Sequence, residues 1–225
     1  KLFLIYGFGK SGFASFKFLN NKNNCKIIDD YPKNIPSKFK KNIIKHKQLK
    51  NFFFDYIILS PGIDINKCKI SRYLNKNKSK IITDLDIFHL NYPKIKKITI
   101  TGTNGKSTTS KLIFDVLKIN KQDARLTGNI GKPILSEKKI NNKTVFVVEA
   151  SSYQLEYSQF FKSDYSLILN LSPDHLERHK NFRNYVNAKF KLIQNQSKGK
   201  HAFIENKNFY LNRLIKKSKI KSKVN

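Results

Sequence analysis

The sequence predicts an α/β protein with mostly parallel sheets. Short apolar runs alternate with segments of helical period along most of the 225 residues. Two of these runs end in glycine-rich turns that lead directly into a helix, GFGKSG at residues 7–12 and GTNGKST at residues 102–108. Because strand, glycine turn and helix in that order are typical of parallel sheets, we expect a Rossmann-like N-terminal domain followed by a second α/β domain.

The first half of the chain carries the Rossmann-like pattern. Apolar runs at residues 2–6, 25–28 and 56–59 predict strands, and Phe13, Phe16 and Leu19 mark the helix after the first glycine turn. Asp29 follows the glycines by about 20 residues, the offset at which such a unit places its ribose-binding carboxylate. The same amides would hold the pyrophosphate of a dinucleotide or of a nucleotide sugar, and both remain open.

Tyr92-Pro93 breaks the pattern, and we expect a domain boundary near residue 93, between domains at residues 1–93 and 94–225. A strand at residues 95–101 then leads into the second glycine turn and its helix. Further strands are expected at residues 145–148 and 166–169, with a helix over residues 185–194. From residue 198 onward the chain is rich in Lys and only a poorly defined helix is expected.

The second turn predicts a phosphate-binding loop for ATP or GTP. Its glycines let successive amides wrap an anion, Lys106 can neutralise the β and γ phosphates, and the Ser107 hydroxyl can coordinate magnesium. The strict Walker spacing is not met, because Ile100 stands where the first glycine would be. The predicted loop consists of Gly102, Thr103, Asn104, Gly105, Lys106, Ser107 and Thr108.

Three further polar residues follow predicted strands or turns. Glu149 ends the strand at residues 145–148 and could bind magnesium or be a satisfied surface acid. His175 follows the strand at residues 166–169 and could be a ligand or an ordinary loop histidine. Asn129, in the turn GNIG, could offer its amide to a substrate or serve the turn alone. The carboxyl ends of parallel strands are where an α/β sheet presents its ligands, which favours the functional interpretation.

The charge of +30 arises from 45 Lys+Arg against 15 Asp+Glu. Only five of the basic residues are Arg, and the Lys are scattered, so we do not expect nucleic-acid binding. The charge should instead attract a polyanionic small ligand. No apolar run approaches the roughly 20 residues of a membrane span, and Cys25 and Cys68 lack metal-ligand spacing. We expect a cytoplasmic protein that does not bind a membrane.

Five segments together resemble the Mur ligase family. They are GTNGKST, GNIG, VVEASSYQLE at residues 147–156, ILNLSPDHLERH at residues 168–179, and Asn187-Ala188-Lys189 in the predicted helix. They occur in the order and approximate spacing of that family, and the resemblance covers essentially residues 1 to 195. GFGKSG and LSPGI, at residues 59–63, are similar to the members that join D-glutamate to UDP-N-acetylmuramoyl-L-alanine, with other members of the family as the alternative.

The resemblance implies an ATP-dependent amide ligase of peptidoglycan synthesis, and so of cell wall biogenesis, cell shape and division, that works through an acyl phosphate. It implies catalytic roles for Lys106, His175 and Lys189. It also implies two Mg²⁺ ions held by Ser107, Glu149, His175 and Lys189, with Lys189 carrying a carbamate. The residues that it assigns to the uridine nucleotide are Lys10, Ser11, Asp29, Asp30, Ser60, Gly62, Asn129 and Ser151.

The family has three domains, and the chain resembles the first and part of the second. We therefore expect the 225 residues alone to bind the uridine nucleotide, to bind ATP weakly at best, and not to turn over. We also expect a monomer. Tyr31 departs from the family, which often has a basic residue after the Asp pair. A non-catalytic or split fragment remains an alternative. A folylpolyglutamate synthase would lack the segment before Tyr92, and a dehydrogenase would not need GTNGKST.

Overall fold

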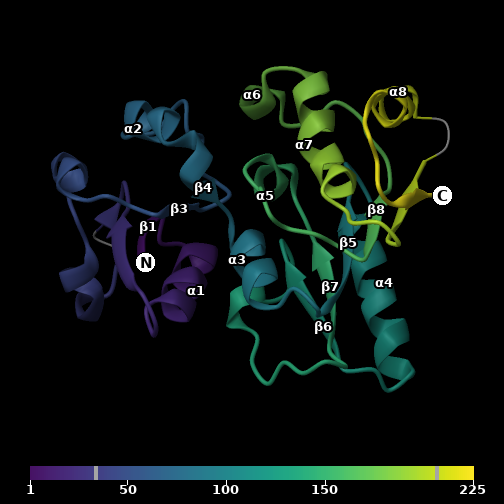
Figure 1. Ribbon diagram of the computed structural model, residues 1–225, viewed down its shortest axis with the longest axis horizontal. Coiled ribbons are helices and arrows are strands. Elements are labelled where there is room, and N and C mark those ends of the chain that lie inside the picture. The colour runs from purple at the N-terminus through teal and green to yellow at the C-terminus, as the bar shows by residue number, and fades with distance from the viewer. Residues whose placement is uncertain (33–34, 206–207) are drawn as a thin grey trace.

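The chain folds into two parallel sheets joined by the helix α3 (Asp84–Asn91) (Figure 1). The structure is a computed structural model and describes residues 1–32, 35–205 and 208–225. One sheet has four strands in the order β2-β1-β3-β4, and the other has six in the order β10-β9-β8-β5-β7-β6. Every strand pair of the two sheets is parallel, which confirms the predicted fold class.

The four-stranded sheet contains the three strands predicted near the N-terminus, and each glycine turn leads into a helix as expected. The fourth strand has two residues and was not predicted, because so short a run shows no period. The strands are β1 (Leu2–Tyr6), β2 (Asn24–Ile28), β3 (Tyr56–Leu59) and β4 (Ile81–Ile82). The helices are α1 (Lys10–Leu19) and α2 (Ser71–Lys76), with 3-10 turns η2 (Ser37–Asn42), η3 (His46–Asn51) and η4 (Lys78–Lys80).

The six-stranded sheet contains the strands expected after residue 94 and three more. The segment after residue 198, where the sequence pattern is unclear, forms two short strands around a helix. The strands are β5 (Lys96–Thr101), β6 (Ala124–Gly128), β7 (Val145–Glu149), β8 (Tyr165–Ile168), β9 (His201–Ile204) and β10 (Lys223–Val224). The helices are α4 (Lys106–Ile119), α5 (Ser152–Glu156), α6 (Leu176–His179), α7 (Phe182–Gln194) and α8 (Phe209–Lys217), with the 3-10 turn η5 (Ile134–Ser136).

A single hydrophobic cluster extends from the first sheet to the second. It contains Phe3 and Ile5 of β1, Phe88 of α3, and Phe146 and Val148 of β7. The rings of Phe88 and Phe146 lie 4.5 Å apart between centroids. The predicted domain boundary near residue 93 falls between α3 and β5 and remains a prediction, since the packing crosses it. Among the described residues, no helix is long and apolar enough to cross a membrane.

The first glycine turn requires a very close approach at one position. A Cβ atom built on Gly12 would lie 1.9 Å from the backbone oxygen of Gly7, which cannot move without displacing the turn. Only glycine therefore fits where α1 begins to pack against the end of β1.

Gly12→Ala should lower the free energy of unfolding by about 1–3 kcal/mol, because overpacking against backbone outweighs the better helix propensity of Ala. The matched control is Gly62→Ala, since a Cβ there meets no atom within 4 Å. Urea unfolding of both variants checks the prediction, and equal losses of stability would contradict it.

Candidate functional site

The predicted phosphate loop lies between the end of β5 and the start of α4. Gly105 has φ 78°, a left-handed conformation that favours glycine and that starts the helix. Several hydrogen bonds tie the loop to the chain after β8, among them Thr103 N to Asn170 O at 2.9 Å and Asn104 N to Asn170 Oδ1 at 2.8 Å. The Lys106 ammonium donates to Thr103 O at 2.6 Å, so it lies folded over its own loop. Asn170 was not singled out from the sequence.

Glu149 joins this loop to two neighbouring strand ends. Its carboxylate is fully buried, and Oε2 accepts a hydrogen bond from Ser107 Oγ at 2.8 Å. Oε1 accepts one from Asn129 Nδ2, also at 2.8 Å. Three residues predicted from separate segments therefore meet at the carboxyl ends of β5, β6 and β7. The alternative of a surface acid does not fit a side chain with no exposure.

Lys189 reaches the same loop from α7. The residue is 2% exposed, and its ammonium donates to Gly102 O at 2.9 Å and to Thr101 Oγ1 at 3.3 Å. Burial, and then the positive charge of Lys106, lower the pKa of Lys189 to about 7, while the charges of Asp174 and Glu149 act in the opposite direction. An amine with this pKa is substantially neutral at physiological pH, unlike an ordinary surface lysine.

Tyr185 links Lys189 to the loop and was missed by the sequence analysis. Its hydroxyl lies 3.0 Å from Thr103 Oγ1, and the Lys189 ammonium lies 4.7 Å from the centre of its ring. The two side chains are four residues apart on α7 and so share a helix face. This four-residue spacing could have indicated that Tyr185 lies beside Lys189, but a Tyr and a Lys at that spacing are not specific in a chain with so many lysines.

His175 lies at the rim of this cluster. Its backbone is left-handed, with φ 53°, and its ring contacts Tyr153 at 4.9 Å and Tyr185 at 6.4 Å between centroids. The Nε2 atom lies 3.4 Å from Asp174 Oδ2. The side chain is nearly half exposed. His175 is therefore close to Tyr185, while its polar neighbours are acids of its own loop.

The side-chain oxygens at the loop are of the kind that magnesium prefers. Ser107 and Glu149 offer hard oxygen atoms beside a phosphate loop, and Mg²⁺ commonly takes one or two protein oxygens and completes its shell with water and phosphate. The described residues contain no cluster of three His, Cys, Asp or Glu side chains that would hold a metal without further ligands. A metal here would depend on oxygens from the phosphates.

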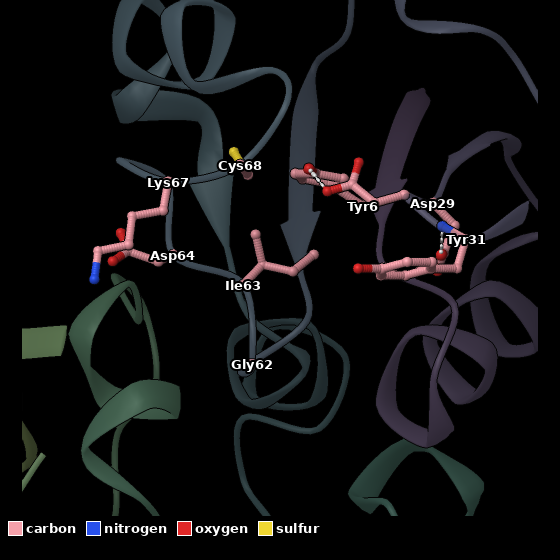
Figure 2. A pocket seen from close by; sticks show the side chains of 10 residues that line it. Tyr6, Asp29, Tyr31, Gly62, Ile63, Asp64, Lys67 and Cys68 are labelled. Carbon is pink, nitrogen blue, oxygen red and sulfur yellow. Dashed lines mark hydrogen bonds between the residues drawn. The ribbon is translucent and has the colours of Figure 1, made fainter. Parts of the chain in front are cut away.

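A second site is a cavity of about 390 Å³ at the carboxyl ends of β1, β2 and β3 (Figure 2). Asp29, Asp30 and Gly62, three of the residues that the resemblance assigns to the uridine nucleotide, line it. The other lining residues were not predicted individually, although the segment after LSPG supplies four of them. They are Tyr6, Gly7, Tyr31, Ile63, Asp64, Lys67 and Cys68.

Hydrogen bonds shape the acidic side of this cavity. Asp29 Oδ2 accepts from Phe8 N at 2.6 Å and Oδ1 from Tyr31 N at 2.7 Å, so this carboxylate closes two loops. Asp30 Oδ2 accepts from the Tyr6 hydroxyl at 2.9 Å. Burial raises the pKa of Tyr6, which keeps the phenol protonated as the donor.

Four further residues that the resemblance assigns to the uridine nucleotide lie outside this cavity, and three of them form hydrogen bonds within the chain. Ser11 Oγ donates to Asp84 Oδ2 at 2.6 Å, and Ser60 Oγ donates to Gly7 O at 2.8 Å. Ser151 caps α5 by accepting from Gln154 N at 3.2 Å. Lys10 is exposed at the first position of α1. The cavity at β1 to β3 does not include these four side chains among its lining residues.

Comparison with protein families gives a match between residues 100–224 and the model of the Mur ligase middle domain. A curated relative from Rickettsia bellii, named UDP-N-acetylmuramoylalanine–D-glutamate ligase, is 36% identical over 217 residues, which are 94% of this chain and 47% of the relative. A protein of the same name from Caldicellulosiruptor saccharolyticus is 31% identical over 207 residues, 87% of this chain and 46% of the relative. The chain thus spans about half the length of these relatives.

Solved structures share the fold. The crystal structure of UDP-N-acetylmuramate:L-alanyl-gamma-D-glutamyl-meso-diaminopimelate ligase from Neisseria meningitides covers all of this chain with a TM-score of 0.59, and the chain covers 76% of it. A murein peptide ligase from Psychrobacter arcticus matches 99% of this chain with a TM-score of 0.52, and the chain covers 52% of it. At 14% and 13% identity, these two similarities concern the fold alone.

Because burial lowers the pKa of Lys189 to about 7, we expect its neutral amine to react with dissolved carbon dioxide. In ¹³C-bicarbonate at pH 8, NMR should show a carbamate signal that grows as pH rises through about 7, in line with the pKa of the amine. Lys189→Arg should remove this signal.

Lys191→Arg is the matched control, because Lys191 lies two positions away on α7 with a pKa that burial also lowers. It should keep the signal. Retention of the pH-dependent signal in Lys189→Arg would contradict the assignment.

Proposed function

The chain belongs to the Mur ligase family, and on that premise we propose that it forms the precursor-binding and ATP-binding parts of a ligase that joins D-glutamate to UDP-N-acetylmuramoyl-L-alanine. The name shared by the relatives supports this choice of substrates within the family. Because the chain spans about half of each relative, the complete activity is part of the proposal.

One observation carries the proposal. The phosphate loop, the buried Glu149 carboxylate and the Lys189 amine meet at one edge of the six-stranded sheet, through Ser107 on one side and Gly102 on the other. A second cavity with Asp29, Asp30 and Gly62 lies at the corresponding edge of the four-stranded sheet. Two ligand sites at the carboxyl ends of two parallel sheets suit a reaction between a nucleotide-linked acid and ATP.

The proposed reaction forms an amide in two steps. A carboxylate oxygen of the alanyl group attacks the γ-phosphorus of ATP, the bond from that phosphorus to the β,γ-bridging oxygen breaks, and ADP leaves. The amine of D-glutamate then attacks the acyl carbon and loses a proton, and inorganic phosphate leaves. Both partners of the first step are anions, so the Lys106 ammonium would leave Thr103 O and offset the charge of the phosphates.

Magnesium, when bound, would neutralise phosphate charge and hold the transferred group in line. We propose that Ser107 and Glu149 hold one ion, and that His175 with a carbamate on Lys189 serves a second. A protonated Lys189 would repel a cation, whereas an amine that has added carbon dioxide presents anionic oxygen atoms. The lowered pKa of Lys189 supports this role, and the rim position of His175 would bring its ring within reach of a ligand at Tyr185.

The uridine nucleotide would occupy the cavity of Figure 2, against Asp29, Asp30 and Gly62. Lys10, Ser11 and Ser60 would contribute through the glycine turn and the β3 loop that they stabilise, and Asn129 and Ser151 would lie towards the reacting end. We propose that the protein acts in the cytoplasm in peptidoglycan synthesis, as a monomer without a nucleic-acid partner. The scattered lysines and the scarcity of arginine support the last point.

Isothermal titration calorimetry on the 225-residue chain tests this assignment. UDP-N-acetylmuramoyl-L-alanine should bind, and NADH should not. Lys106→Ala should abolish binding of Mg·ATP and leave binding of the uridine nucleotide unchanged, because the two sites lie on different sheets. Lys111→Ala is the matched control, since Lys111 lies on α4 with its exposed ammonium paired to Asp115.

Two results would contradict the assignment. One is binding of NADH in preference to the uridine nucleotide, which would favour a dehydrogenase. The other is loss of Mg·ATP binding in Lys111→Ala to the same degree as in Lys106→Ala, which would mean that general charge, and not the loop, binds the nucleotide. Binding of the uridine nucleotide without any Mg·ATP binding would favour the alternative of a non-catalytic fragment.

A further inference from the structure

Two buried carboxylates stand at the start of α3. Asp84 is 4% exposed and Asp86 is fully buried. The Oδ2 atom of Asp86 caps its own helix by accepting from Thr83 N at 2.8 Å and from Thr83 Oγ1 at 3.1 Å. The helix cap therefore uses only one of the two carboxylate oxygens of Asp86.

The other oxygen of Asp86 serves a distant segment of the second sheet. Oδ1 accepts four hydrogen bonds from residues 158–161, which follow α5. The donors are Ser158 Oγ at 2.8 Å, Gln159 N at 3.0 Å, Phe160 N at 2.7 Å and Phe161 N at 2.8 Å. Bonds to an ionised acceptor are stronger than neutral ones, and burial removes competition from water.

These contacts extend in both directions to the two candidate sites. Ser11, in the glycine turn of the first sheet, donates to Asp84 Oδ2 at 2.6 Å. At the other end, residues 158–161 are continuous through α5 with Ser151 and Glu149. Gln159 Nε2 adds a bond to Ser79 O at 3.1 Å, just before β4. The start of α3 thus touches the glycine turn on one side and the segment that leads from Glu149 on the other (Figure 1).

A second contact holds the connection after α3. Lys97 at the start of β5 is 1% exposed, and its ammonium donates to the carbonyls of Tyr92 at 3.3 Å and Pro93 at 3.4 Å, as well as to that of Ile95. The chain between α3 and β5 is therefore fixed to the strand that carries the phosphate loop. A free linker would leave these carbonyls to solvent.

We propose that Asp86, supported by Asp84, is a positioning residue that fixes the first cavity and its glycine turn relative to the phosphate loop, so that the two sheets move as one body. A helix cap alone would need only Oδ2. The four donors on Oδ1 come from the loop after α5, and in Asp86→Asn the amide nitrogen would face either these donors or those of Thr83, so that one set would lose its acceptor. The inference stands on contacts within the chain and does not depend on the reaction proposed above.

Distances between spin labels test the proposal directly. Lys76→Cys on α2 and Lys118→Cys on α4 place labels at exposed positions of the two sheets. Cys68→Ser removes the accessible native thiol, and Cys25 is buried. Double electron-electron resonance on this chain should give a single narrow distance distribution. Asp86→Asn should broaden it or add a second population, while circular dichroism retains the helix and strand content.

Asp55→Asn is the matched control, because the Asp55 carboxylate bonds Leu2 N at 2.7 Å within the first sheet and is exposed. It should leave the distribution unchanged. Ser158→Ala removes one of the four donors and should broaden the distribution less than Asp86→Asn.

A folded Asp86→Asn variant with the width of the parent chain would overturn the proposal. If Asp86→Asn does not fold, Ser158→Ala decides in its place: broadening supports the proposal and an unchanged width overturns it. Calorimetry with the uridine nucleotide and with Mg·ATP separately keeps this result distinct from the proposed function, since a failure of either ligand to bind the parent chain concerns only that function.

Discussion

The buried carboxylate of Glu149 is the constraint on which the candidate site depends. A negative charge with no exposure is costly unless it is hydrogen-bonded and close to positive charge. The hydroxyl of Ser107 and the amide of Asn129 satisfy its oxygens, and the charge of Lys106 acts in the same region. These contacts draw the ends of three adjacent strands together and leave an electrostatic balance that suits a phosphate chain with a divalent cation.

Burial and charge also account for the properties of the two lysines beside the loop, Lys106 and Lys189. Burial, and then the charge of Lys106, lower the pKa of Lys189, which is 2% exposed. Lys106 folds onto Thr103 O, and Lys189 lies against Tyr185 and Gly102 O. Each lysine nitrogen thus donates to a backbone oxygen of the loop.

Local patterns predicted much of the fold, and long-range contacts explain what was missed. The early strands and both glycine turns follow from short runs, whereas the bonds of Ser107 and Asn129 to Glu149 were not predicted. The two-residue β4 and the Lys-rich tail showed too little period. Ser11 and Ser60, predicted to contact the substrate, donate to Asp84 and Gly7 in the structure, and sequence gives residue type but not such orientation. Asp86 carried no signal, because its donors lie 72 to 75 residues away.

That separation also matters for the order in which the chain is made. When α3 leaves the ribosome, the donors of Asp86 and the strand bearing Phe146, the ring against which Phe88 packs, have not yet been synthesised. Until residue 161 emerges, the Asp86 carboxylate therefore lacks its donors, and the Phe88 ring lacks its partner in the second sheet. A translational pause between residues 90 and 161 would prolong that exposure, and the nascent chain would then be most open to chaperones and proteases.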